Sequence, residues 1–227
     1  MRKYFAEFIG TFFLVLTIGC TVMGHGAGPF APLAIGFALM VMVFAGGHIS
    51  GGHFNPAVTL GVWLRGKCET KDVVPYMVFQ TIGALVAAFV VKFLKGGAAV
   101  APLHPATLPA LLAECLFTFA LVYVVLNVAT AKGTSGNSFY GLAIGSTVLV
   151  GAFAVGGISG GVFNPAVAAG ISVMGISSWT NIWIYLVADF AGAALAAGAF
   201  AVLNPAERQG VRHSHPRELP QEQIEAA

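Results

Sequence analysis

The sequence is poor in charge. Of its 227 residues only 9% are Asp, Glu, Lys or Arg, while 57% are hydrophobic. An ordinary soluble domain carries roughly 25% charged residues, and a soluble protein of this size could not cover its surface with so few. Three cysteines, an odd number, are too few for a disulfide scaffold. The high apolar content also excludes a disordered chain. The class that remains is a membrane protein that crosses the bilayer several times.

The motifs of several other classes are absent as well. No basic patch is interleaved with aromatic residues, so we expect no nucleic-acid partner. The chain has no phosphate-binding loop, no dinucleotide fingerprint and no nucleophile beside a base. His48 and His53 flank one glycine-rich segment, but no third or fourth metal ligand lies near them in sequence. We therefore predict that the chain is not an enzyme and has no cofactor or bound metal.

Long apolar stretches are what the sequence does contain. Six have the length of about 20 residues that spans a bilayer: 4–23, 32–50, 73–94, 108–130, 139–157 and 179–203. Two shorter stretches follow the second and fifth, and each begins with Asn-Pro-Ala, at Asn55 and Asn164. Each runs about ten residues, which at about 1.5 Å per residue crosses only half the hydrocarbon core. The sequence predicts an all-α membrane protein with six transmembrane helices and two re-entrant half-helices.

The chain also repeats itself. Residues 47–58 recur as residues 156–167, at an offset of 109, with ten of twelve positions identical. Each half holds three full spans, and because three is odd the second half must enter the membrane from the opposite side, so the repeats are inverted. We expect a channel domain over 1–205, with repeats at about 1–97 and 107–205. A polar cytoplasmic tail follows at 206–227, and its composition predicts disorder.

The basic residues orient the chain. With the N-terminus in the cytoplasm, nine of the eleven Lys and Arg residues are cytoplasmic, and only Lys92 and Lys95 lie outside. The apolar N-terminal stretch faintly resembles a lipoprotein signal, but Glu7 interrupts it and further spans follow, so we interpret it as a retained first helix. We expect a multi-pass protein of a prokaryotic inner (cell) membrane, in contact with lipid, with both termini in the cytoplasm.

The repeated motif predicts a pore. Asn is a good helix N-cap and Pro suits the first helical position, so each Asn-Pro-Ala begins a half-helix. Two half-helix N-termini meeting at mid-membrane, each with roughly half a positive charge, repel cations, and the Asn amides can donate to a passing oxygen. The motif residues are Asn55, Pro56, Ala57, Asn164, Pro165 and Ala166.

The segment before each motif is rich in glycine. Non-helical backbone at membrane depth is tolerated only inside protein or beside a wet cavity. We therefore expect these loops to line the pore and to present a ladder of carbonyl acceptors. The loop residues we expect there are His48, Gly51, Gly52, His53 and Gly160. Protonation of His48 is a candidate gate for the cytoplasmic mouth.

These features resemble the aquaporin or major intrinsic protein family. The resemblance rests on the two Asn-Pro-Ala motifs in inverted three-span repeats, on Gly-His-Ile-Ser-Gly-Gly-His-Phe-Asn-Pro-Ala-Val-Thr at 47–59, and on the opening Ala-Glu-Phe-Ile-Gly-Thr. It covers about 1–205. It implies a right-handed bundle with one pore per subunit and a homotetramer. It also implies that Glu7 and Glu114 hold the backbone of the non-helical loops.

The resemblance places a selectivity filter at Ile35, Ala152, Gly161 and Val167. Family members usually carry an arginine three residues after the second Asn, where this chain has Val167. In this respect the chain looks like a bacterial-type member without the filter arginine. Water-selective relatives usually carry bulky Phe and His at the first two positions, so this filter should be wider and more apolar. Valine offers neither the donors nor the charge of a guanidinium.

The expected function is passive conduction of small uncharged solutes as well as water. A wide filter suits neutral metalloid hydroxides such as arsenite, and also boric acid, glycerol or urea. Glycerol-conducting relatives usually place aspartate after the arginine, whereas Ala168 follows Val167 here, which favours a metalloid-like solute. The alternatives are a mainly water-conducting aquaporin, a glycerol facilitator or a coupled secondary transporter. Coupling would need a titrating residue at mid-membrane, for which Asp189 in the sixth span is the candidate.

Overall fold

The computed structural model describes residues 1–98 and 100–208. Its main elements are six long helices: α1 (Arg2–Val22), α2 (Ala31–Ser50), α4 (Thr70–Leu94), α5 (Thr107–Thr130), α6 (Tyr140–Ser159) and α8 (Ile182–Leu203). Each is long and apolar enough to cross a membrane. The predicted all-α fold with six spanning helices is confirmed, and the helix ends lie within three residues of the predicted ones.

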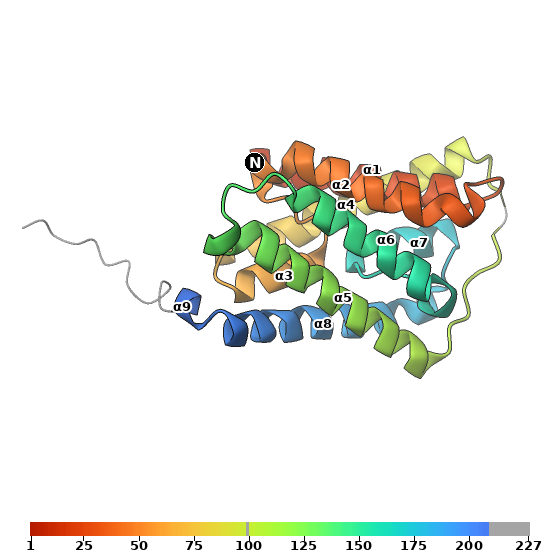
Figure 1. Cartoon of the computed structure of the whole chain (residues 1–227). Coiled ribbons are helices and arrows are strands. Elements are labelled where there is room, and N and C mark those ends of the chain that lie inside the picture. The colour runs from red at the N-terminus through yellow and green to blue at the C-terminus, as the bar shows by residue number, and fades with distance from the viewer. Residues whose placement is uncertain (99, 209–227) are drawn as a thin grey trace, which may run out of the picture.

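Two short apolar helices lie within the bundle of long ones (Figure 1). They are α3 (Pro56–Leu64) and α7 (Pro165–Met174), with nine and ten residues. Each is preceded by a loop that returns from the end of a long helix, α2 or α6, to the middle of the bundle. Short 3-10 turns, η1 (Gly28–Phe30), η2 (Lys132–Thr134) and η3 (Trp179–Asn181), precede other helices. The helices α3 and α7 are the two predicted re-entrant half-helices.

The connections of the bundle gather at two opposite ends. The N-terminus and the short helix α9 (Pro205–Arg208) lie at the same end, on the left of Figure 1. We call this end the terminal face. The connections at 23–30, 95–98, 100–106 and 175–181 lie at the other end, which we call the distal face.

Glycines at equivalent positions let the long helices approach closely. A Cβ on Gly83 would lie 2.5 Å from the carbonyl oxygen of Phe8, which brings α4 against α1. At the same offset of 109, a Cβ on Gly192 would lie 2.5 Å from the carbonyl oxygen of Cys115, which brings α8 against α5. Lipid is as apolar as the helix surfaces, so close packing at small residues is a main source of helix association in membranes.

Large apolar side chains remain on the outside of the bundle. Phe89 is 64% exposed, Phe93 84% and Leu195 60%. A soluble protein avoids apolar surface on this scale, but a helix facing hydrocarbon needs no cover.

The end of the chain departs from the predicted boundary. We expected the polar tail to begin at 206, yet 206–208 belong to α9, and the side chain of Glu207 is only 11% exposed. The bundle therefore includes residues beyond the predicted domain end. Positions 209–227, which make up the rest of the predicted tail, lie outside the described residues.

Candidate permeation pathway

The two re-entrant loops have the same backbone conformation. Gly51 and Gly52 have φ of 92° and 64°, and their equivalents Gly160 and Gly161 have φ of 99° and 64°. Residues with a side chain rarely adopt this left-handed region. Phe54 and Phe163, just before each Asn, also adopt it, with φ of 48° and 49°, so the surrounding structure must hold both phenylalanines in place.

Buried carboxylates bind the backbone of these loops. Glu7 on α1 accepts hydrogen bonds from the N–H groups of His53, at 3.0 Å, and Phe54, at 2.6 Å. Glu114 on α5 accepts from the N–H groups of Val162, at 3.0 Å, and Phe163, at 2.6 Å. Both Glu side chains are fully buried. Loop N–H groups that neither helix nor water can satisfy thus obtain strong acceptors.

Further loop contacts come from residues that the sequence reasoning did not single out. Tyr76 on α4 donates to the carbonyl of Ser50 at 2.7 Å, and Tyr185 on α8 donates to the carbonyl of Ser159 at 3.0 Å. Gln80 on α4 donates to Glu7 at 2.8 Å. The tyrosines are separated by 109 residues, like the Asn-Pro-Ala motifs, so extending the repeat comparison into the third and sixth spans would have found them.

The two Asn-Pro-Ala motifs are joined tip to tip. Asn55 Oδ1 accepts from the N–H of Ala57 at 2.8 Å, and Asn164 Oδ1 accepts from the N–H of Ala166 at 2.9 Å, so each side chain caps its own half-helix. Asn55 Nδ2 donates to the carbonyl of Phe163 at 2.7 Å. Asn164 Nδ2 donates to the carbonyl of Phe54 at 2.9 Å. Each half-helix therefore begins against the opposite loop.

This arrangement divides the hydrogen-bonding capacity of the two amides. Each Asn side chain has two N–H donors, and one of them is used by the opposite loop. The other makes no hydrogen bond to the described protein atoms, and both Asn55 and Asn164 line a central cavity. One donor on each Asn is thus left for a permeating oxygen.

The central cavity is narrow and mostly apolar. Its volume is about 30 Å³, and one water needs about 10–15 Å³, so the cavity has room for about two waters. Aliphatic side chains from α1, α2, α5 and α6 form most of the wall, with His53, Asn55 and Asn164 as the polar side chains among the lining residues. The polar groups of the loops therefore form a polar strip on an otherwise apolar cavity wall.

All four predicted filter residues lie together at the distal side of this cavity. Ile35, Ala152, Gly161 and Val167 line a second cavity of about 460 Å³ that reaches the distal connections. Among the described residues that line it, every side chain is apolar. A Cβ on Gly161 would lie 3.1 Å from Cα of Ala152, so these two positions are neighbours. Three of the four, all but Ala152, also line the central cavity, so the two spaces adjoin.

The terminal face opens into a third cavity, of about 720 Å³, whose lining includes many polar side chains. Gly51 lines it, while the adjacent Gly52 lines the central cavity, so the three spaces follow one another through the bundle. Gly160 lines the distal cavity in the same way. The side chains that make the terminal cavity polar are His48, Lys67, Thr130, Lys132, Thr134, Ser135, Asn137 and Tyr140. The pathway is therefore asymmetric, basic at one mouth and apolar at the other.

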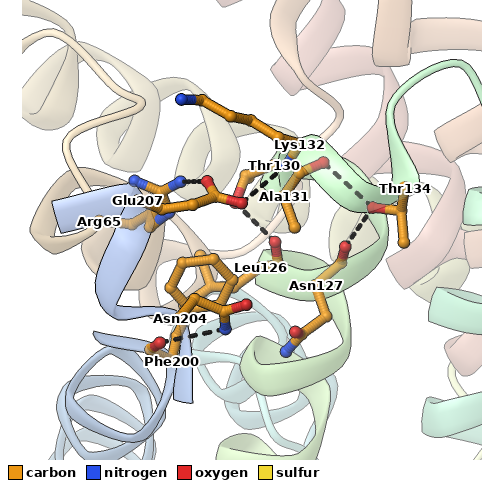
Figure 2. Close-up of polar contacts among 10 residues, drawn as sticks. All are labelled: Arg65, Leu126, Asn127, Thr130, Ala131, Lys132, Thr134, Phe200, Asn204 and Glu207. Carbon is orange, nitrogen blue, oxygen red and sulfur yellow. Dashed lines mark hydrogen bonds and ion pairs between the residues drawn. The ribbon is translucent and has the colours of Figure 1, made fainter. Parts of the chain in front are cut away.

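One wall of the terminal cavity is tied to α9. Glu207 accepts a hydrogen bond from the backbone N–H of Lys132 at 2.8 Å and forms an ion pair with Arg65 at the end of α3 (Figure 2). The Arg65 guanidinium also lies 4.6 Å from the ring centroid of Phe200 on α8. The Arg65 side chain is only 7% exposed. No sequence pattern indicated this network, because Glu207 falls in the predicted tail.

We expect Glu207→Gln to lower the thermal stability of the protein. The change leaves the nearly buried guanidinium of Arg65 without an anion, and breaking a buried pair costs on the order of 3 kcal/mol. Thermal unfolding of the purified protein in detergent measures the effect. Glu69→Gln is the matched control, because Glu69 pairs with Lys71 on the surface, where both side chains are mostly exposed, and should change little.

The backbone bond to Lys132 can be tested separately. Lys132→Pro removes the N–H that Glu207 accepts, while Lys132→Ala keeps it. Proline fits there, because Ala131 is extended, with φ −78° and ψ 142°, as a residue before proline should be. The free energy of unfolding of Lys132→Pro should be about 1 kcal/mol lower than that of Lys132→Ala. Lys132→Pro should therefore melt at a lower temperature. Equal melting of these two variants would show that the bond contributes nothing.

Half-helices joined tip to tip between two inverted repeats, with cavities in series on either side, define a membrane channel. The chain matches the family described as Major intrinsic protein over residues 1–200, and it belongs to that family. Members of this family are passive channels and not enzymes, so the prediction of a non-enzymatic, multi-pass membrane protein is confirmed.

Two relatives illustrate the range of the family. Aquaporin NIP1-4 of Oryza sativa subsp. japonica is 36% identical over 214 residues, which covers 89% of this chain and 77% of that protein. Glycerol uptake facilitator protein-like 6 of Lactiplantibacillus plantarum is 38% identical over 207 residues, which covers 87% of this chain and 95% of that protein. The solved aquaglyceroporin of Plasmodium falciparum superposes with a TM-score of 0.77 at 23% identity, covering 92% of this chain and 98% of that one, and agrees in fold.

Proposed function

We propose that this channel conducts small uncharged solutes through a filter wide enough for neutral metalloid hydroxides, such as arsenite as its trihydroxide, as well as water. The observation that carries the proposal is the apolar lining of the distal cavity around Val167. At the position where relatives usually present a guanidinium, this chain presents two methyl groups. A solute meets neither a positive charge nor fixed side-chain donors there.

The size of the filter residues supports a solute larger than water. Gly161 has no side chain, Ala152 has a single methyl group, and Ile35 is of medium size. Single-file water loses hydrogen bonds beside apolar walls, whereas a wider filter admits a bulkier neutral molecule.

Backbone acceptors beside the filter support a solute with hydroxyl donors. The carbonyls of Gly160, Gly161 and Val162 accept no hydrogen bond from the described residues, and these three residues line the distal cavity. Carbonyl oxygens accept from O–H groups and offer no donor. A neutral polyhydroxy molecule matches this lining better than an anion or an aprotic solute.

Stopped-flow light scattering on proteoliposomes tests the proposal by comparing water, glycerol and arsenite, at a pH where arsenite is neutral. We expect arsenite to enter well above the rate in empty liposomes, with a flux that rises linearly with concentration. Arsenite at the empty-liposome rate together with fast water would indicate a water channel. Glycerol faster than arsenite would indicate a glycerol facilitator, and saturating flux a coupled transporter. Each of these three results would overturn the proposal.

We also expect protons and other cations to be excluded despite the missing arginine. Two half-helix N-termini still abut at the motifs, each with roughly half a positive charge, and both Asn caps are intact. A pH-sensitive dye sealed inside proteoliposomes should report a proton leak close to that of empty liposomes. A leak comparable to that of an ionophore would refute the expectation.

The organisation of the channel in the cell is proposed on similar grounds. Arg65, Lys67 and Lys132 lie at the terminal face, whereas Lys92 and Lys95 lie at the distal face, which supports cytoplasmic termini. We propose a channel domain that extends to α9, at about 1–208, in the cell membrane, assembled as a homotetramer as in the family it belongs to. Native mass measurement in detergent tests the assembly, and labelling of a single introduced surface cysteine with an impermeant reagent tests the orientation.

A further inference from the structure

The two halves of the bundle differ at one buried position behind the loops. Gln80 on α4 and Asp189 on α8 are 109 residues apart, the offset that relates Asn55 to Asn164. In the first half, Gln80 Nε2 donates to Glu7 Oε2 at 2.8 Å. The second half has a carboxyl group where the first has an amide donor.

Asp189 has no donor for one of its oxygens. Its side chain is fully buried, and Oδ1 accepts from the hydroxyl of Thr118 at 3.0 Å. Oδ2 is buried without any hydrogen-bond partner among the described residues. A buried acceptor left unsatisfied costs roughly 1–3 kcal/mol, and more when it is charged.

The neighbour of Asp189 is a second acid. Glu114 lies four residues before Thr118 on α5, so the two share a helix face, and the side chains of Glu114 and Asp189 are in contact. The other titratable groups facing Asp189 are Cys115 on α5 and Tyr185 on α8 itself. The half-helices α3 and α7, which also pack on α8, carry no titratable side chain. Arg65 meets α8 at Phe200, which is eleven residues, or about 16 Å, along the helix from Asp189, so this cation does not face the pair of acids.

Two carboxylates in dry contact cannot both be ionised, since nothing there compensates their repulsion. The roles of the two acids are unequal. Glu114 already accepts from the N–H groups of Val162 and Phe163, so it acts as the acceptor. We infer that Asp189 is a protonated carboxylic acid that donates to Glu114, as Gln80 donates to Glu7, and that it thereby positions the second re-entrant loop.

This makes the second loop dependent on a proton where the first is not. The loop that Glu114 holds carries Gly161 of the filter and leads into Asn164. Loss of the proton would place two negative charges behind this loop and weaken the anchor beside the filter. Asp189 is therefore a positioning residue that acts through Glu114, and it has no contact with the permeating solute.

Infrared spectroscopy of the purified channel in lipid tests the inference. The wild type should show the C=O stretch of a protonated carboxylic acid, and Asp189→Asn should remove it. Asp189→Asn should also keep the wild-type melting temperature and water permeability, because the Asn amide supplies the same donor. Asp189→Leu removes donor and acceptor together and should lower both.

The first half supplies the matched control. Gln80→Glu rebuilds the acid pair beside Glu7 and should add a second carboxylic-acid band. Water permeability of the wild type should fall at strongly alkaline pH, while that of Asp189→Asn should not. A wild-type spectrum without a band sensitive to Asp189→Asn would overturn the inference, as would an Asp189→Asn variant that is as unstable as Asp189→Leu.

Discussion

Replacing Val167 with arginine should reduce the permeability to arsenite and glycerol by about tenfold or more, which corresponds to about 1.4 kcal/mol. Val167 lines both the distal and the central cavity, so a guanidinium at this position occupies the narrow junction between them. Water is small enough to pass beside it and to exchange hydrogen bonds with it, so water permeability should change by only about threefold, or about 0.7 kcal/mol. Stopped-flow measurements on the same proteoliposomes give both values.

A second variant separates size from charge at this position. Val167→Met lengthens the side chain without adding donors or a charge. If width alone controls passage, Val167→Met should reduce solute permeability about as much as Val167→Arg. A larger loss in Val167→Arg assigns part of the effect to the guanidinium. Unchanged solute permeability in Val167→Arg would contradict the assignment of Val167 to the filter.

Replacing Glu7 with leucine should cause the largest loss of stability among single substitutions in the loop anchors. Glu7 accepts from the N–H groups of His53 and Phe54, from the hydroxyl of Ser50 and from the amide of Gln80. Leucine leaves all four donors buried, and each unsatisfied donor costs about 1–3 kcal/mol. We expect a loss of roughly 4 kcal/mol or more, seen as early melting or as failure to purify a folded channel.

The matched control for Glu7 is a conservative change at the same site. Glu7→Gln keeps one carbonyl acceptor but turns an amide N–H toward donors, so its melting temperature should lie between those of Glu7→Leu and the wild type. A Glu7→Leu channel that melts like the wild type would show that Glu7 is not needed to hold the first loop.

Much of the architecture follows from the sequence, because its signals are local. The lengths of the apolar stretches predict the six spans, and Asn-Pro-Ala predicts where α3 and α7 begin. The offset of 109 relates the halves, and the odd number of spans per half inverts them. The filter positions, which the family resemblance placed, lie together around one cavity.

Other features depend on residues that are distant in the chain. The sequence suggested that both Asn amides face the solute. In the structure each amide donates one N–H to the carbonyl of a residue 108 or 110 positions away. The sequence did not reveal a partner for Asp189, because its donor Thr118 lies on α5, 71 residues earlier in the chain. Glu207 was assigned to a tail, yet it binds Arg65, 142 residues away. A one-dimensional pattern cannot reveal such contacts unless the repeat itself relates the two residues.

The lengths of the apolar stretches and the repeated motif are therefore enough to establish a channel of two inverted halves, because the length of a span and the start of a helix depend on neighbouring residues. The packing of the helices decides which buried donor meets which acceptor, and which side chains share a cavity wall. In hydrocarbon every buried polar group needs a partner, and those partners come from whichever helix the fold brings alongside. The loop anchors, the Glu207 network and the apolar distal mouth belong to this second kind of information.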